Sequence, residues 1–298
     1  MPLCLRYPRS HQRGEVIGLE PIVLAVLGGF VLLVVAWLVT RAVRSRVTSV
    51  ADVESATGLV VIGPISGKGL RRPLQSLNGL RFRTEPDGLE RICRLLRHNG
   101  LGTAIKVLTV VPASSRQVGS GFAVNLARTL AAEETSVLLI LADLRHAVTR
   151  STLGLSDLTG LGELLEGDPR DPVMALVSVT DHLLVLPCGK AVDDPAKLLA
   201  RPALGGIIGS LRDLGLITII DAPPAGFAAD VVPLAREADA TLLIVQGGSG
   251  RHEVEVAARV LRHGRVGDPA AVLVGTRRLR SLAAGIPPRP ALDTGSGV

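Results

Sequence analysis

From Ile105 onward, short apolar runs alternate with segments that have helical periodicity. The runs are rich in Val, Leu and Ile, and each has the length of a strand that is buried on both faces. They lie at 107–111, 137–142, 183–187, 217–220, 241–245 and 271–274. Strands that alternate with helices form parallel sheets through right-handed crossovers. The sequence therefore predicts an α/β domain with a mainly parallel sheet flanked by helices.

Composition fits this fold class and argues against several kinds of protein. Hydrophobic residues make up 47% of the chain and aromatic residues only 2%, so aliphatic side chains must fill the core. The formal charge of +6 comes from scattered arginines, and the aromatic side chains on which nucleic-acid bases stack are scarce. Cys4, Cys93 and Cys188 lack the spacing of a zinc site or a disulfide framework. We expect no nucleic-acid partner and a reducing compartment.

Near the start of the chain, Pro21–Thr40 is uncharged and strongly apolar. A helix of about 20 residues is about 30 Å long, which matches the hydrocarbon core of a bilayer. Trp37 lies near one end, where an indole at the membrane interface is expected. A buried core helix and a cleaved signal peptide are the alternatives, but the former is seldom apolar on every face for so long. We predict one transmembrane helix at 21–41, preceded by a short arm at 1–20.

Between this helix and the α/β domain, residues 42–104 are predicted to form a juxtamembrane linker and an oligomerisation helix. Within this segment, 49–57 is expected to be a short helix and 59–65 a short strand. Residues 66–88 are rich in Gly, Arg, Pro and Ser, as linkers are. Apolar residues recur on one side of 89–98, which predicts an amphipathic helix.

Arginines flank the apolar helix equally on both sides, so the positive-inside rule does not orient it. They are Arg6, Arg9, Arg13, Arg41, Arg44 and Arg46. We place the C-terminal side in the cytoplasm because the domain at 105–280 has the architecture of a nucleotide site, and ATP is found there. The Pro/Gly/Ser-rich tail at 281–298 is expected to be disordered.

The first strand of the domain leads into a loop that resembles a phosphate-binding loop without its lysine. Apolar residues at 107–111 precede a small, polar segment, and a helical pattern begins near Ser120. In a P-loop, backbone N–H groups and the helix dipole receive the phosphate, and a lysine contacts the β- and γ-phosphates. Here the helix opens with Gly119-Ser120-Gly121, and no lysine lies between Pro112 and the end of the helix.

Two aspartates follow apolar strands at the same edge of the predicted sheet. Asp143 ends the run at 137–142, and Asp221 ends the run at 217–220. Ligands of such sheets bind beyond the carboxyl ends of the strands, and a carboxylate there can hold Mg²⁺ through water. Each aspartate alone could equally cap a helix or a turn. Together with the loop, they indicate an inherited nucleotide site.

At this point the chain resembles the bacterial tyrosine kinase and polysaccharide co-polymerase family, to which capsular and exopolysaccharide chain-length regulators belong. Leu138–Arg145 (LLILADLR) resembles the family's second Walker motif, L-L-I-D-A-D-L-R, and Ile219–Pro224 (IIDAPP) resembles its Walker B motif. Further similar stretches follow the family's order at Gly58–Ile65, Arg94–Asn99, Gly160–Gly167, Leu186–Lys190 and Asp194–Leu199. The resemblance implies a P-loop NTPase-like fold related to that of the MinD and ParA proteins.

The resemblance also assigns roles to particular residues. A degenerate P-loop would contain Arg116, Gly119, Ser120 and Gly121. If any nucleotide binds, Mg²⁺ would be held by Ser120, Asp143 and Asp221. Oligomerisation would involve Glu90, Arg94 and Arg97.

Several positions depart from the family pattern. The family reads P-G-E-G-K-S-T in the P-loop, whereas Gly119 stands at the lysine position here and Gly121 at the threonine position. Leu141 replaces the first aspartate of the second Walker motif. In the E-x-x-R-x-x-R motif the Glu position is Arg91, and Glu90 is one residue out of register. The purine-facing Asn is missing, Tyr7 is the one tyrosine, and the family's extracytoplasmic domain and first membrane helix are not found.

We therefore expect a single-pass protein of the bacterial inner membrane with a catalytically impaired, ATPase- and kinase-like cytoplasmic domain. By resemblance it would regulate or scaffold surface polysaccharide synthesis and export, as an oligomer with itself or with co-polymerase and polymerase components. Binding of Mg-ATP or ADP is expected to be weak. The alternatives are an active but divergent tyrosine kinase or ATPase that uses Arg116, a MinD/ParA-like positioning ATPase, and an eroded product without activity.

Overall fold

A computed structural model shows two compact units, Met1–Ser45 and Arg46–Val298, and each is considered by itself. The description covers residues 27, 29–34, 37, 46–66, 89–97, 105–114, 118–145, 155, 158–267 and 269–275. No helix among these residues is both long enough and apolar enough to cross a bilayer. The helix predicted at 21–41 lies mostly outside them and stays a prediction. The arm at 1–20 and the tail at 281–298 lie outside them entirely.

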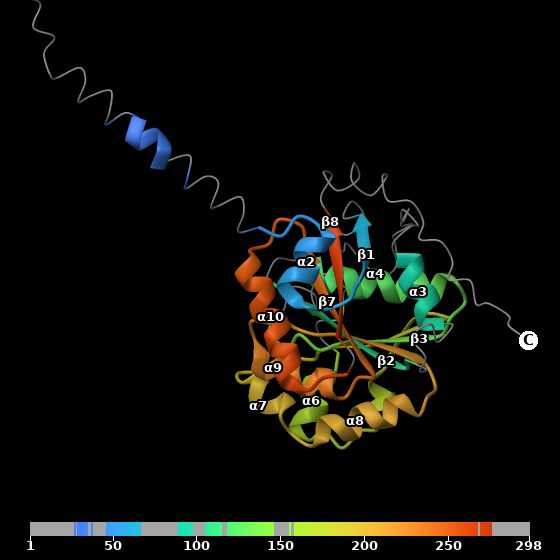
Figure 1. Cartoon of the computed structure of the whole chain (residues 1–298). Helices are drawn as coiled ribbons and strands as arrows, with labels where there is room; N and C mark the ends of the chain where they lie inside the picture. Colours follow the sequence, from blue (N-terminus) through green and yellow to red (C-terminus); the bar gives the residue numbers. More distant parts are fainter. Residues whose placement is uncertain are drawn as a thin grey trace, which may run out of the picture. The chain divides into compact units, whose positions relative to one another are not determined.

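The second unit is built on one eight-stranded sheet in the order β1-β8-β7-β2-β6-β3-β5-β4 (Figure 1). Its strands are β1 (Val61–Ser66), β2 (Val107–Pro112), β3 (Val137–Leu141), β4 (Val177–Thr180), β5 (Leu183–Leu186), β6 (Ile217–Asp221), β7 (Ala240–Gln246) and β8 (Pro269–Gly275). Every pairing is parallel except that of β4 with β5. Strands β2 and β3 are buried along their whole length, as apolar strands covered on both faces must be. The predicted fold class is confirmed as a mainly parallel sheet flanked by helices.

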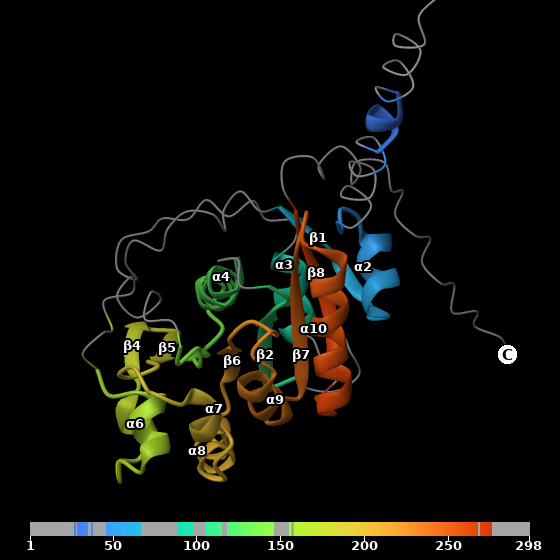
Figure 2. The same ribbon diagram turned by 90° about the vertical axis from the view of Figure 1, so that its left-hand side faces the viewer.

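Helices cover both faces of this sheet. They are α2 (Val50–Thr57), α3 (Leu89–Arg97), α4 (Val118–Ala132), α6 (Leu161–Glu166), α7 (Pro195–Leu199), α8 (Ala203–Arg212), α9 (Ala228–Arg236) and α10 (Arg251–Gly264), with a 3₁₀ turn η1 (Pro172–Ala175). Helix α4 packs on β2, β3 and β6, and α3 packs on α4. Helices α9 and α10 contact β2 and β7, and Figure 2 shows α10 and α4 on opposite sides of β7.

The sheet begins before the predicted start of the domain at residue 105. Ser49 caps α2 by accepting a hydrogen bond from the Asp52 N–H, and α2 packs against α10. Strand β1 pairs in parallel with β8 and forms one edge of the sheet. The Arg262 guanidinium donates to the carbonyl oxygen of Thr57, which ties α10 to the end of α2. Residues 46–66 are therefore an integral part of the domain rather than a linker.

Several elements were missed by the sequence patterns, among them β4 and α9. Strand β4 is only four residues long, and its side chains are alternately half-buried and exposed, so it has no apolar run. Helix α9 contains Pro233, a residue that usually marks the end of a helix. Both elements depend on tertiary packing that local periodicity does not record.

At the opposite edge from the strand ends, Asp239 joins the start of β2 to α8. Its Oδ2 accepts hydrogen bonds from the N–H groups of Lys106 and Val107 at 2.9 and 2.8 Å, and its Oδ1 accepts from Arg212 at 2.7 Å. Burial raises the pKa of Asp239, but the hydrogen bonds from Arg212, Val107 and Lys106 outweigh burial and hold this pKa below its ordinary value. The ionised carboxylate is therefore favoured by the folded state.

We expect Asp239→Asn to lower the free energy of unfolding by about 2–3 kcal/mol at pH 7, because an amide cannot satisfy all three donors. Since the folded pKa is depressed, the stabilisation is fully present above the unfolded pKa of about 3.9 and is lost as the pH falls through the folded value. Chemical denaturation of both proteins between pH 7 and pH 3 measures this difference. Asp213→Asn, at an exposed position beside α8, is the control. A constant difference across this pH range would contradict the prediction.

The packing of α2 on the domain gives a second prediction. Val53 is fully buried on α2, whereas Val60 is 75% exposed. Val53→Ala should lower the free energy of unfolding of the whole domain by about 1.5–3 kcal/mol through lost burial and a cavity. Val60→Ala should change it by less than about 0.5 kcal/mol. If Val53→Ala left the main unfolding transition unchanged, residues 46–66 would be separable from the domain.

Candidate functional site

The two predicted aspartates meet at the carboxyl edge of the sheet. Asp221 is the last residue of β6, which lies between β2 and β3, and its register partners are Val110 and Leu141. The Ala142 N–H donates to the carbonyl oxygen of Asp221 at 2.9 Å, so the chain leading to Asp143 passes directly beside β6. Asp221 is 1% exposed and Asp143 is 9% exposed. The sheet thus brings two largely buried carboxyl groups to one edge, as the strand-end argument predicted.

The strand–loop–helix frame of the phosphate loop is also present. Gly119, Ser120 and Gly121 lie in the first turn of α4, where backbone N–H groups point away from the helix. Buried Asn125, one turn further on, donates to the Gly121 carbonyl oxygen at 2.7 Å. Arg116 lies outside the described residues, as do the side chains of 119 and 120. The part that the structure describes therefore offers a helix N-terminus and leaves the Arg116 hypothesis untested.

Next to this edge, Arg145 makes an ion pair that the sequence did not predict. Its guanidinium contacts both carboxylate oxygens of Asp230 on α9, with Nη2 donating to Oδ1 at 3.0 Å and Nε donating to Oδ2. The same guanidinium lies 4.8 Å from the centre of the Phe227 ring. The hydrogen bonds that Arg145 donates to Asp230 and the charges of Asp230, Asp194 and Asp143 outweigh burial and raise the pKa of Arg145. Arg145 is thus a permanent cation held by a buried carboxylate.

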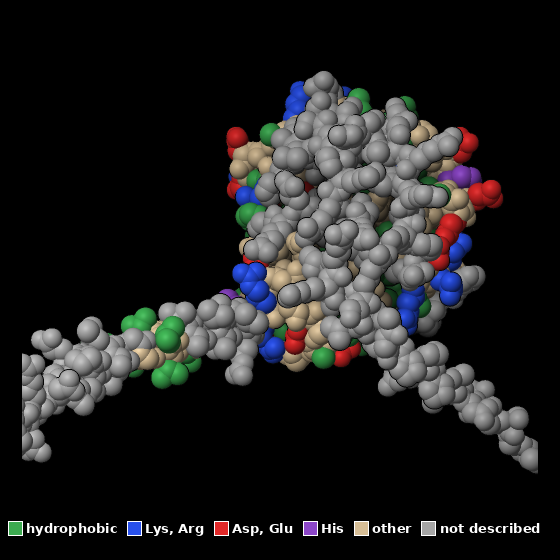
Figure 3. All heavy atoms as spheres, turned by 90° about the horizontal axis from the view of Figure 1, so that it is seen from above, with side chains coloured by type: hydrophobic (Ala, Val, Ile, Leu, Met, Phe, Trp, Pro, Cys, Tyr) green, Lys and Arg blue, Asp and Glu red, His purple; other side chains and the backbone are tan. Residues whose placement is uncertain are grey.

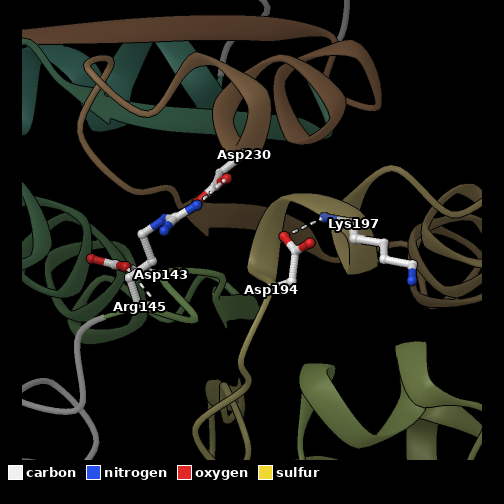
Figure 4. A network of polar contacts seen from close by, with 5 residues as sticks. All are labelled: Asp143, Arg145, Asp194, Lys197 and Asp230. Atoms are coloured by element: carbon white, nitrogen blue, oxygen red, sulfur yellow. Dashed lines mark hydrogen bonds and ion pairs between the residues drawn. The ribbon is translucent and has the colours of Figure 1, made fainter.

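Figure 4 shows how these charged groups are arranged. Arg145 extends toward Asp230, while Asp194 lies across from it at the start of α7. Asp194 accepts a hydrogen bond from the backbone N–H of Lys197 at 3.1 Å and so caps α7. The Lys197 side chain points away from the other labelled groups. Among these five residues, Arg145 is therefore the cation that faces the aspartates.

Two of the family-like stretches meet at Glu163. Its Oε2 accepts from the Gly160 N–H and its Oε1 accepts from the Lys190 N–H, both at 2.9 Å. Gly189 has a φ of +82°, and a Cβ there would collide with the Glu163 carboxylate. The order of these motifs in the sequence thus reflects a structural contact between the start of α6 and the loop after β5.

The predicted oligomerisation residues differ in their surroundings. Glu90 and Arg94 are exposed on α3, one helical turn apart. Arg97 instead forms an ion pair with Glu133, just beyond the end of α4, at 2.7 Å. All three residues are exposed, and Arg97 in addition has an ion-pair partner within the chain.

Charges elsewhere on the surface are mixed. On the face of the second unit shown in Figure 3, basic and acidic side chains of the described residues alternate around the rim. The described part of the chain contains no cluster of three or more His, Cys, Asp or Glu side chains arranged to hold a metal. The carboxylates of Asp143 and Asp221 have the chemistry to hold a hydrated Mg²⁺.

The chain is similar in sequence to bacterial tyrosine-protein kinases. No family model matches the chain. It is 28% identical over 148 residues to the tyrosine-protein kinase CpsD of Streptococcus agalactiae, which covers 49% of this chain and 64% of that protein. It is 28% identical over 257 residues to the putative tyrosine-protein kinase EpsB of Ralstonia solanacearum, which covers 82% of this chain and 34% of that protein. The chain thus spans less than two thirds of each of these curated relatives.

Solved structures show the same fold. The kinase domain of the Escherichia coli tyrosine kinase ETK matches 77% of this chain and 96% of its own, with a TM-score of 0.65 and 21% identity. The BceF tyrosine kinase domain matches 77% of this chain and 99% of its own, with a TM-score of 0.63 and 22% identity. The resemblance to bacterial tyrosine kinases is thus confirmed by the sequence relatives, and the solved kinase domains show the same fold.

Proposed function

We propose that this protein is a membrane-anchored, catalytically impaired relative of the bacterial tyrosine kinases that regulates or scaffolds surface polysaccharide synthesis and export. The observation that carries the proposal is the contrast at the carboxyl edge of the sheet. Asp143 and Asp221 remain at their strand ends and α4 presents its N-terminus, but the lysine position is Gly119. The two carboxylates that would bind Mg²⁺ are therefore present, whereas the lysine that would bind the phosphates is replaced by glycine.

The free energy that the lysine would contribute indicates that its absence impairs catalysis more than nucleotide binding. A charge-assisted hydrogen bond contributes about 1.5–3 kcal/mol, so loss of the lysine weakens nucleotide binding by about ten- to a hundredfold. The N–H groups and dipole of α4 can still attract a phosphate. Phosphoryl transfer suffers more, because positioned positive charge at the γ-phosphate is most of what a protein contributes to that reaction.

Arg145 is a poor substitute for the missing lysine. Its Nε and Nη2 groups already donate to the two carboxylate oxygens of Asp230, and Asp230 is 1% exposed. Moving the guanidinium to a phosphate would leave a buried carboxylate without its counter-charge, which is strongly unfavourable. A bound nucleotide would therefore depend on the α4 N-terminus and on Mg²⁺ held by Ser120, Asp143 and Asp221.

The alternative is an active, divergent ATPase or tyrosine kinase of the same pathway. The buried carboxyl groups of Asp143 and Asp221 favour this alternative, because burying a carboxyl group is unfavourable unless a partner such as a metal ion compensates for it. It requires a cation to replace the lysine, and Arg116 is the candidate within the loop. Nucleotide affinity decides between the two.

We expect millimolar Mg-ATP to stabilise the wild-type protein only slightly. A ligand at its dissociation constant adds about 0.4 kcal/mol to the free energy of unfolding, and one at a hundred times that concentration adds about 2.7 kcal/mol. Restoring the family residues with Gly119→Lys and Gly121→Thr should increase the affinity by about ten- to a hundredfold. Thermal unfolding with and without millimolar Mg-ATP compares the proteins directly.

Asp221→Ala is the matched control for this experiment, and it should abolish the gain in the restored protein. A large shift in the wild-type protein that Asp221→Ala removes would support the active alternative instead. No shift in either the wild-type or the restored protein would show that the edge no longer receives a nucleotide.

We further propose that residues 21–41 anchor the protein in the bacterial inner membrane, with the second unit in the cytoplasm. Association with itself or with co-polymerase and polymerase components would use the exposed face of α3. Glu90→Lys and Arg94→Glu should each reduce co-purification of partner chains after gentle detergent extraction by about tenfold, because like charges across an interface repel. Glu54→Lys, on the exposed side of α2, is the control. Equal recovery from all variants would contradict a role for α3.

A further inference from the structure

The ion pair between Arg145 and Asp230 joins the two loops that carry the candidate metal ligands. Arg145 lies in the loop after β3, two residues beyond Asp143, and Asp230 lies in the first turn of α9, in the segment that follows Asp221. The two residues are 85 positions apart in the chain. Figure 4 shows the guanidinium bridging from one element to the other.

Each end of this bridge is fixed by further contacts. On one side, the Arg145 N–H donates to Oδ1 of Asp143 at 3.2 Å, which sets the orientation of that carboxylate. On the other side, the guanidinium lies over Phe227, the residue that begins α9. The Ala225 N–H donates to the carbonyl oxygen of Pro112 at 2.8 Å, so the same segment also contacts the end of β2. The pair thus connects the segments that follow β3 and β6, and the segment after β6 also contacts the last residue of β2.

Burial and geometry make this pair durable. Asp230 is 1% exposed, and the side chain of Arg145 is 33% exposed. Two parallel contacts between a guanidinium and a carboxylate fix orientation as well as distance, and a buried carboxylate without a partner is strongly unfavourable. A lysine could not reproduce this arrangement, because an ammonium group has no planar fork.

We propose that Arg145 is a positioning residue: by pairing with Asp230, it holds the loops after β3 and β6 as one unit and keeps Asp143 oriented toward a metal shared with Asp221. This rests on the proposed function, in which a divalent ion bridges these carboxylates and a nucleotide. Arg145 then acts through Asp143 and does not contact the phosphates. Weak nucleotide binding without the P-loop lysine would depend on this arrangement.

Asp230→Asn is the most informative variant. It keeps the shape of the side chain and removes the charge that holds Arg145, without leaving a charged group buried alone. A direct phosphate contact by Arg145 predicts the opposite effect from a positioning role. If Arg145 contacts the phosphates, releasing its guanidinium from Asp230 would strengthen nucleotide binding with or without metal. If Arg145 positions Asp143, the same variant would weaken only the metal-dependent binding.

The experiment uses the full chain in detergent, with Mn²⁺ and ADP as probes. Bound Mn²⁺ is measured by electron paramagnetic resonance, and loop opening is measured by hydrogen exchange. Asp230→Asn should lower the affinity for Mn-ADP by at least about tenfold, or about 1.4 kcal/mol, and speed exchange about tenfold in both loops. Arg145→Lys should show the same effects to a smaller degree. Asp168→Asn, in the partly exposed pair with Arg170, is the matched control and should show neither effect.

The outcomes separate this inference from the proposed function. Faster exchange in both loops together with weaker Mn-ADP binding supports the positioning role. Unchanged exchange, unchanged affinity, or tighter binding in Asp230→Asn would overturn it. If the wild-type protein binds no Mn-ADP at millimolar concentration, the nucleotide part of the proposed function fails and the metal-positioning role fails with it. Faster hydrogen exchange of both loops in Asp230→Asn would in that case show that the Arg145–Asp230 pair only links the two loops structurally.

Discussion

In the centre of the sheet, β6 is hydrogen-bonded to β2 on one side and to β3 on the other, and all three strands run in the same direction. Their carboxyl ends must therefore meet at one edge, together with the loops that follow them. Asp143, Asp221 and the N-terminus of α4 are neighbours because of this pairing. The packing of apolar strands on both faces fixes the pairing, so the edge persists whatever residues occupy it.

This separation of scaffold from chemistry explains how the fold tolerates a missing lysine. Gly119 lies in the first turn of α4. The core is formed by residues such as Phe122, Leu126 and Leu130 on the same helix, all fully buried. Loss of the lysine removes charge from the edge without removing packing. Fold and family resemblance can thus remain while phosphoryl transfer is lost.

Local patterns were sufficient for the fold and for part of the site. Apolar runs located the central strands, and their last residues located Asp143 and Asp221. Strand β4 and helix α9 were missed, since a half-exposed strand and a helix containing Pro233 are stabilised by their neighbours rather than by periodicity. The pair of Arg145 with Asp230 could not be predicted either, because its members are 85 positions apart. The ion pair of Arg97 with Glu133 was likewise beyond reach, because Arg97 lies on α3 and Glu133 just beyond the end of α4, while the oligomerisation role stays a prediction.

The electrostatics of the edge follow from the same contacts. Arg145 pairs with Asp230 and lies within electrostatic range of Asp143 and Asp194, so aspartates outnumber the cation within this group of described residues. Such a group repels a bare polyphosphate and attracts a divalent ion. Under the proposed function, a protein without the P-loop lysine would bind metal and nucleotide together, each reducing the cost of the other. Nucleotide affinity should then depend on metal concentration more steeply than in a relative that retains the lysine, because the lysine no longer offsets the charge of the aspartates.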